Sequence, residues 1–203
     1  MLRRSLVTSL ALLAMAAAPV RSLACSFEDP NGAAAQRVIL SVVYPNALYV
    51  EGAVYTALTE GILRPAHFAQ PGDFFALDRI ARNLRRFAGL LGSEAPPDMP
   101  EFSMVLMGPV LWTRFSPGAD GIAAEPHVAG PLSGKVVVVS DAPVVAALVK
   151  GDLSGRSANE AGLLRYYGDA AEIEKISAAL VAAFPGGGYE LGSAGQDVPV
   201  ASQ

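Results

Sequence analysis

The chain has few reactive side chains. Its 203 residues include one cysteine, Cys25, and two histidines, His67 and His127. A single cysteine cannot form an intramolecular disulfide, so stability must come from a hydrophobic core, for which the chain is long enough. The patterns typical of serine hydrolases, zinc proteases, phosphate-binding loops and dinucleotide-binding folds are missing. We therefore expect no enzymatic activity and no cofactor.

The soft and imidazole ligands are too dispersed to predict a metal site. His67 and His127 would need carboxylates from distant segments, and loop histidines are commoner than metal ligands. Met99, Met104 and Met107, together with an exported cysteine, would suit Cu(I). However, Met104 and Met107 are three apart on an expected strand, so they point to opposite faces. Core packing is the favoured interpretation.

Basic residues are also scarce. The chain has 15 Lys and Arg against 19 Asp and Glu. Removal of residues 1–24 would take away Arg3, Arg4 and Arg21 and no acidic residue, leaving a net charge of −7. This balance disfavours nucleic acid and anionic lipid surfaces as partners.

The first 24 residues have the layout of an export signal. Arg3 and Arg4 form a positively charged n-region, and Ser5 to Ala18 form an apolar h-region. Ser22-Leu23-Ala24 has the small-x-small pattern of a signal-peptidase cleavage site. The run is shorter than the roughly 20 residues of a membrane span, which disfavours the alternative of an uncleaved anchor. We expect cleavage between Ala24 and Cys25 and a periplasmic or secreted protein.

Cys25 has two open interpretations. Leu-Ala-Cys resembles part of a bacterial lipobox, although Ser22 stands where leucine is usual. In this interpretation Cys25 is a lipidation site, and its lipid anchors the chain to a membrane. Alternatively, ordinary cleavage leaves a free thiol that can pair with another molecule. No neighbouring His or Lys would lower the pKa of this thiol, so a thiol enzyme is not expected.

Two helices are predicted in the first half of the remaining chain. Residues 25–45 look irregular, with a turn at Pro30-Asn31-Gly32. A helix is expected from a cap at Asn46 to Gly61, and a second one after a cap at Asp73. The second helix has an apolar stripe on one face and Arg79, Arg82, Arg85 and Arg86 mostly on the other. Without interleaved aromatic residues, these arginines indicate a solvated face rather than a nucleic-acid site.

Strands dominate the next segment. "FSMVLM", "VLWTRFS", an extended piece around 125–128 and "KVVVVS" are expected strands. Asp141 and Asp169 can each cap a later helix, and "LSGRSANEA" a short one between them. The expected fold is α+β: a small, mostly antiparallel sheet packed against helices, with an N-terminal helical extension. We expect a signal peptide at 1–24, an extension with one helix at 25–72, an α+β domain at 73–185 and a flexible tail at 186–203.

The segment 135–180 resembles the C-terminal half of the sterol-carrier-protein type-2-like domain. Gly151 and Leu153 match the family's "G-x-L" step, and Ala158 or Ala161 its alanine. The "G-x-L-x-h-x-G-[ND]" strand is matched by Gly162, Leu164, Tyr166, Gly168 and Asp169. The resemblance implies a lipid-binding α+β domain without a catalytic group. Residues 25–72 have no counterpart in it.

Two functions follow as hypotheses. The first is an exported, non-catalytic protein that binds a lipid or other apolar small molecule in a cavity beside the last helix. Its expected ligand-binding residues are Trp112, Leu164, Tyr166, Ile173, Ile176 and Leu180. The second is an accessory subunit of a bacterial cell-envelope complex, in which the helical part 46–92 docks a protein partner. A cavity would favour the first, and a filled core with an exposed apolar patch the second.

Overall fold

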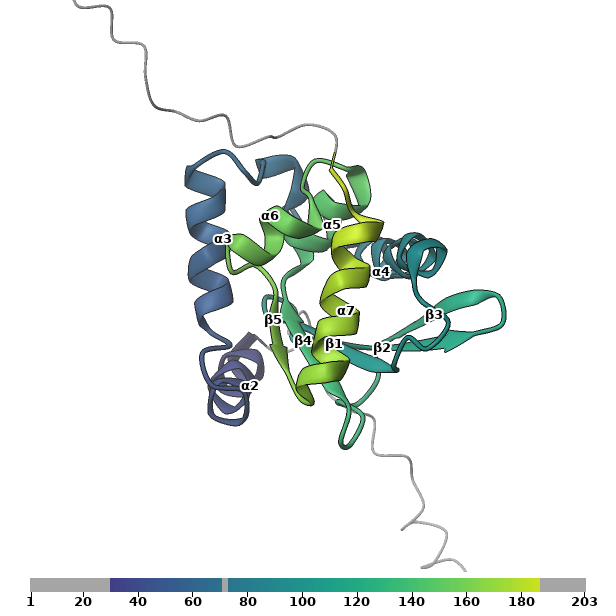
Figure 1. The fold of residues 1–203 in the computed structure, drawn as a ribbon. Coiled ribbons are helices and arrows are strands. Elements are labelled where there is room, and N and C mark those ends of the chain that lie inside the picture. Colours follow the sequence, from purple (N-terminus) through teal and green to yellow (C-terminus); the bar gives the residue numbers. More distant parts are fainter. Residues whose placement is uncertain (1–29, 71–72, 187–203) are drawn as a thin grey trace, which may run out of the picture.

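The computed structural model of the chain describes residues 30–70 and 73–186. Within them, one five-stranded sheet packs against helices (Figure 1). This confirms the predicted α+β class, with a mostly antiparallel sheet and a helical N-terminal region. The predicted signal peptide, Cys25 and all but the first residue of the predicted tail lie outside the described residues.

The helical N-terminal region precedes the sheet. Its elements are α2 (Pro30–Val43), α3 (Tyr49–Thr59), the 3-10 turn η1 (Pro65–His67) and α4 (Ala76–Glu94). The strands follow as β1 (Phe102–Leu106), β2 (Leu111–Gly118), β3 (Gly121–Pro126) and β4 (Val136–Ser140). The last part holds α5 (Ala142–Lys150), α6 (Gly155–Glu160), β5 (Arg165–Tyr167) and α7 (Ala170–Ala183).

The sheet has the order β3-β2-β1-β4-β5. Three neighbouring pairs are antiparallel and β1 runs parallel to β4, with Met104 opposite Val138. The predicted strands at "FSMVLM", "VLWTRFS" and "KVVVVS" are therefore confirmed. The extended piece expected around 125–128 corresponds to β3, which starts earlier because it pairs with β2 directly after the tight turn at 118–121.

One face of the sheet is covered by α4 and α7. Phe87 of α4 stacks on Phe184 at a centroid distance of 4.8 Å and meets Phe115 of β2 edge-on at 5.7 Å. Phe115 in turn stacks on Phe102 of β1. Figure 1 shows α7 crossing in front of the strands on this side. The predicted stripe of α4 is confirmed, since it is buried while the four arginines of this helix are exposed.

The opposite face is partly covered from the N-terminal region. Tyr44, between α2 and α3, packs its ring against Trp112 and Tyr167 at 6.1 and 5.2 Å. The Tyr167 hydroxyl donates to the carbonyl of Pro45 at 2.7 Å. Buried residues of α2 and α3 belong to the same core as the sheet. The domain boundary placed between residues 72 and 73 stays a prediction.

Two sequence expectations for this region are wrong. The segment 25–45 is not irregular throughout, because Pro30–Val43 is helical; proline is tolerated in a first helical turn, where its missing N–H has no partner to lose. Asn46 does not cap α3 with its side chain. It has φ of 71°, its carbonyl accepts from the Tyr49 N–H at 3.0 Å, and the helix starts after Leu48.

The predicted helix caps and glycine turns of the C-terminal part are confirmed. The Asp141 carboxylate accepts from the Ala142 N–H, and Gly151 ends α5 in the left-handed conformation. The Asp169 carboxylate accepts from the N–H groups of Ala171 and Glu172 at the start of α7. Gly168 has φ of 141°, and a Cβ there would lie 3.0 Å from Val136, so this turn needs glycine on both counts.

Candidate functional site

The register of the sheet divides the predicted ligand-binding residues. Tyr166 is paired with Val138, and Val138 with Met104, so these three share the face under α4 and α7. Trp112 is paired with Val105 and belongs to the opposite face. The structure therefore does not bring Trp112 together with the other five residues, and its ring packs on Tyr44 instead.

The side chains beside α7 form packed core. Ile176 and Leu180 are fully buried, Leu164 is nearly so, and Ile173 is half-buried at the edge of the cluster. The Tyr166 hydroxyl donates to Asn159 Oδ1 of α6 at 2.6 Å. Burial raises the pKa of Tyr166 well above its usual range, against the opposing effect of this hydrogen bond, so the phenol stays neutral. A ligand role for these residues stays a prediction.

A pocket of about 230 Å³ lies elsewhere, between the end of α3 and α6. Ile62, Leu153 and Ala161 supply its apolar part, and the hydroxyls of Ser154 and Ser157 its polar part. Glu60 and Glu160 also line it, and both are exposed. We call these seven residues the α3–α6 pocket.

The local sequence explains the α6 side of the pocket. Gly151 turns the chain after α5, and Leu153 points into the core. Ser154 caps α6, because its Oγ accepts from the Ser157 N–H at 3.0 Å and donates to Ser157 Oγ at 2.8 Å. The two hydroxyls are thus fixed by each other at the pocket wall.

Close backbone contact fixes α6 against α7. A Cβ on Gly155 would lie 2.4 Å from the carbonyl oxygen of Leu180 and 3.0 Å from Val181 Cα. The Gly155 N–H donates to the carbonyl of Phe184 at 2.7 Å. Glycine is therefore the residue type that allows the first turn of α6 to lie on the last turns of α7.

A polar cluster joins the α3 side of the pocket to the α6 side. His67 is buried, and its Nε2 lies 2.9 Å from Asp152 Oδ2. His67 Nδ1 accepts from the Arg64 N–H at 3.0 Å, so Nε2 carries the proton and donates to the carboxylate. Arg64 also pairs with Asp152. We call these three residues the His67 cluster.

The His67 cluster lowers the pKa of one of its members. The hydrogen bond from His67 and then the interactions with Arg64 hold the pKa of Asp152 below its usual range, against the effect of burial. Asp152 and Leu153 are adjacent in sequence, so the cluster holds the chain next to the pocket.

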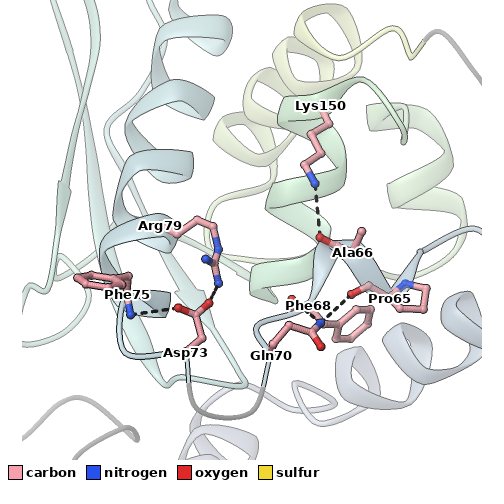
Figure 2. A network of polar contacts seen from close by, with 8 residues as sticks. All are labelled: Pro65, Ala66, Phe68, Gln70, Asp73, Phe75, Arg79 and Lys150. Carbon is pink, nitrogen blue, oxygen red and sulfur yellow. Dashed lines mark hydrogen bonds and ion pairs between the residues drawn. The ribbon is translucent and has the colours of Figure 1, made fainter.

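Further polar contacts lie on either side of residues 71–72, in the segments 64–70 and 73–79, as Figure 2 shows. Lys150, at the end of α5, donates to the carbonyl of Ala66 at 3.4 Å. The Asp73 carboxylate accepts from the Phe75 N–H at 3.1 Å and pairs with Arg79. The predicted cap at Asp73 is wrong, because α4 begins at Ala76 and the Asp73 carboxylate accepts from the N–H of Phe75, which precedes the helix, rather than from an N–H inside it.

Local sequence patterns predict neither the pocket nor the His67 cluster. They predict the Gly151–Leu153 step, but its partners Glu60 and Ile62 lie about ninety positions earlier in the chain. No local spacing links them. His67 is not an ordinary loop histidine, because it is buried in η1 and its pairing with Asp152 depends on tertiary structure. His127 is exposed, with φ of 67°.

The described residues contain neither a candidate metal site nor a candidate membrane span. No group of three or more His, Cys, Asp or Glu residues there is arranged to hold a metal ion. Among the helices of 30–70 and 73–186, none has the length and apolar character of a membrane span. Met99, Met104 and Met107 are all buried in the core.

Comparison with known proteins gives one likeness. No protein-family profile and no curated protein matches the chain. A solved structure, "UbiJ-SCP2 Ubiquinone synthesis protein", is similar with 16% sequence identity and a TM-score of 0.33. The likeness covers 57% of this chain and 96% of that one. At this identity and TM-score it bears on neither ligand nor activity.

Proposed function

We propose that the protein binds a small apolar molecule, or one end of a lipid, in the α3–α6 pocket. The observation that carries the proposal is a concave site with Ile62, Leu153 and Ala161 as its apolar part and two mutually bonded serine hydroxyls at one wall. Few polar groups over an apolar lining are typical of sites for small apolar ligands.

The size of the pocket limits the ligand. Pockets for drug-sized molecules usually enclose about 300–1,000 Å³, and this pocket has about 230 Å³. A short alkyl chain or one ring fits this space, while a complete lipid would leave most of its surface outside. The exposed carboxylates of Glu60 and Glu160 disfavour a ligand whose own carboxylate lies near them.

We also propose that the protein only binds and does not catalyse. Ser154 and Ser157 bond to each other rather than to a histidine. Both ring nitrogens of His67 are already engaged, one by Asp152 and one by the Arg64 N–H. A general base must reach a proton of the substrate or nucleophile, and His67 in this arrangement has no free nitrogen to do so.

Export remains part of the proposal, with a periplasmic or secreted protein that is anchored through Cys25 if this residue is lipidated. It is supported by the arrangement of residues 1–25 alone. Intact-mass analysis of the protein from envelope fractions should give the mass of a chain that begins at Cys25, with or without added acyl groups. A mass that still includes residues 1–24 would refute cleavage.

Native mass spectrometry tests the binding function. The gently purified protein should carry an apolar adduct, or should take one up from a series of fatty acids and matching alcohols. Chain lengths from six to sixteen carbons span the size of the pocket. Each methylene that becomes buried should add about 0.8 kcal/mol to the binding free energy. Uptake should level off once the chain outgrows the pocket. A protein that retains and takes up nothing would contradict the proposal.

The second candidate, an accessory subunit, is favoured by exposed aromatic side chains in the helical part 46–92. Phe74 and Phe75 are 95% and 70% exposed, and Tyr55 is 70% exposed. Aromatic residues are enriched at protein interfaces. A photo-crosslinker at Phe74 should then give one defined adduct in envelope preparations, lost in a Phe75→Ser variant, while a crosslinker at exposed Arg82 gives none.

A further inference from the structure

The helix α2 turns its apolar side away from the protein. Val38, Ile39 and Val43 are each 60% exposed and Val42 is 76% exposed. Ala34 and Ala35 are exposed on the same two rows. We call these six residues the α2 face. No charged side chain belongs to it.

This orientation is fixed by polar contacts on the inner side of the helix. Arg37 Nη1 donates to the carbonyl of Gly108 at 3.1 Å, and its Nε lies 3.5 Å from the Glu51 carboxylate. Leu40, one turn further on, is buried in the core. A rotation of α2 that buried its valines would break these contacts, so the exposure of the α2 face is a property of the fold.

Charge argues against an anionic lipid surface as the occupant. Helices that lie on membranes carry Lys and Arg along their polar side. The only basic residue of α2 is Arg37, and its guanidinium is held inward by Glu51 and Gly108. The excess of acidic residues in the chain has the same effect.

The arrangement of the α2 face matches a second copy of itself. Its residues form two i, i+4 rows, 34-38-42 and 35-39-43, which are the ridges used in the commonest class of helix packing. The rows begin with alanines and end with valines. In an antiparallel pair related by a two-fold axis, the valines of one helix lie opposite the alanines of the other, so large side chains meet small ones.

We propose that the α2 face binds the α2 face of a second copy of this chain in an antiparallel, two-fold dimer. The axis passes between Val38 and Ile39, the centre of the face. A helix of 14 residues is about 21 Å long and covers less than the roughly 800 Å² per partner of a standard interface. The dimer therefore forms in the micromolar range and dissociates on dilution.

Sedimentation equilibrium of the purified chain carrying Cys25→Ser tests the proposal without the native thiol. A monomer–dimer equilibrium is expected, and Val42→Glu should raise its dissociation constant by about 100-fold or more, because two-fold symmetry places a new charge in the interface twice. Leu90→Glu, at an exposed apolar residue of α4, should leave the constant unchanged. A monomer at every soluble concentration, or a dimer indifferent to Val42→Glu, would overturn the proposal.

Cysteine crosslinking tests the geometry in the same background. Ile39→Cys lies next to the axis, where two Cα atoms can approach within the disulfide range of about 4.4–6.8 Å, and should crosslink rapidly under mild oxidation. Tyr55→Cys, on α3 and at least as exposed as Ile39, should not. Equal rates for the two would overturn the antiparallel dimer. Binding of neutral phosphatidylcholine vesicles that Val42→Glu abolishes, with no dimer, would instead identify lipid as the occupant and also overturn it.

Discussion

Replacement of Gly155 by alanine tests how α6 is held against α7. The added Cβ would lie 2.4 Å from the carbonyl oxygen of Leu180 and 2.9 Å from its carbonyl carbon, both backbone atoms. No rotamer change can relieve this contact, so one of the two helices must move. We expect a cost at the upper end of the range for overpacking, about 3 kcal/mol. Alanine regains up to about 1 kcal/mol as the better helix residue.

The net loss of unfolding free energy is therefore about 2 kcal/mol. For a chain of this size, it corresponds to a melting temperature lower by about 4–8 °C, measured by circular dichroism. Gly52→Ala is the matched control, because a Cβ in the middle of α3 would meet nothing within 4 Å. It should stabilise the protein by about 0.5–1 kcal/mol. If Gly155→Ala melts at or above the wild-type temperature, the close contact of α6 with α7 is refuted.

Three further predictions concern burial and charge. Asp152→Ala should lower the unfolding free energy, measured in urea, by about 2 kcal/mol, because it leaves the buried His67 N–H without an acceptor. Arg64→Ala should lower it by less than about 1 kcal/mol, because the Arg64 side chain is mostly exposed. Folding lowers the pKa of Asp152. The difference in unfolding free energy between wild type and Asp152→Ala should therefore be largest above the unfolded-state pKa of about 3.9, and it should shrink as the pH falls through the folded-state pKa. A difference that does not change with pH would contradict the pairing of Asp152 with His67. Ile176→Ala should lower the unfolding free energy by about 2–5 kcal/mol, because Ile176 is fully buried. Ile173→Ala should lower it clearly less, because Ile173 is half-buried. Equal losses in chemical denaturation would refute the packing of α7.

Local signals predicted most of the sheet and the C-terminal helices. The valines of β4, the stripe of α4 and the capping carboxylate of Asp169 each depend on residues within a few positions, and each was predicted in place. Periodicity succeeds there because the apolar side of each element faces the core.

The N-terminal region shows where such reasoning fails. The valines of α2 face outward and its arginine inward, so the apolar pattern identifies neither the helix nor its buried side. The predicted ligand-binding residues are divided between two faces for another reason. Trp112 and Tyr166 both belong to the sheet, but strand register, which sequence spacing does not give, places them on opposite faces. The α3–α6 pocket depends on contacts between distant segments.

Isothermal titration of 1-octanol, an uncharged alcohol, into three proteins tests the proposed pocket most directly. Ala161 lines the pocket and its side chain makes no hydrogen bond, so Ala161→Phe should fill the space without removing a polar contact. Ala178→Phe is the matched control, on the exposed side of α7. We expect the wild type and Ala178→Phe to bind 1-octanol equally, and Ala161→Phe to bind it at least about tenfold more weakly, the equivalent of 1.4 kcal/mol. Equal binding by all three proteins would contradict a ligand site in the α3–α6 pocket, and no binding by the wild type would contradict a ligand of this class.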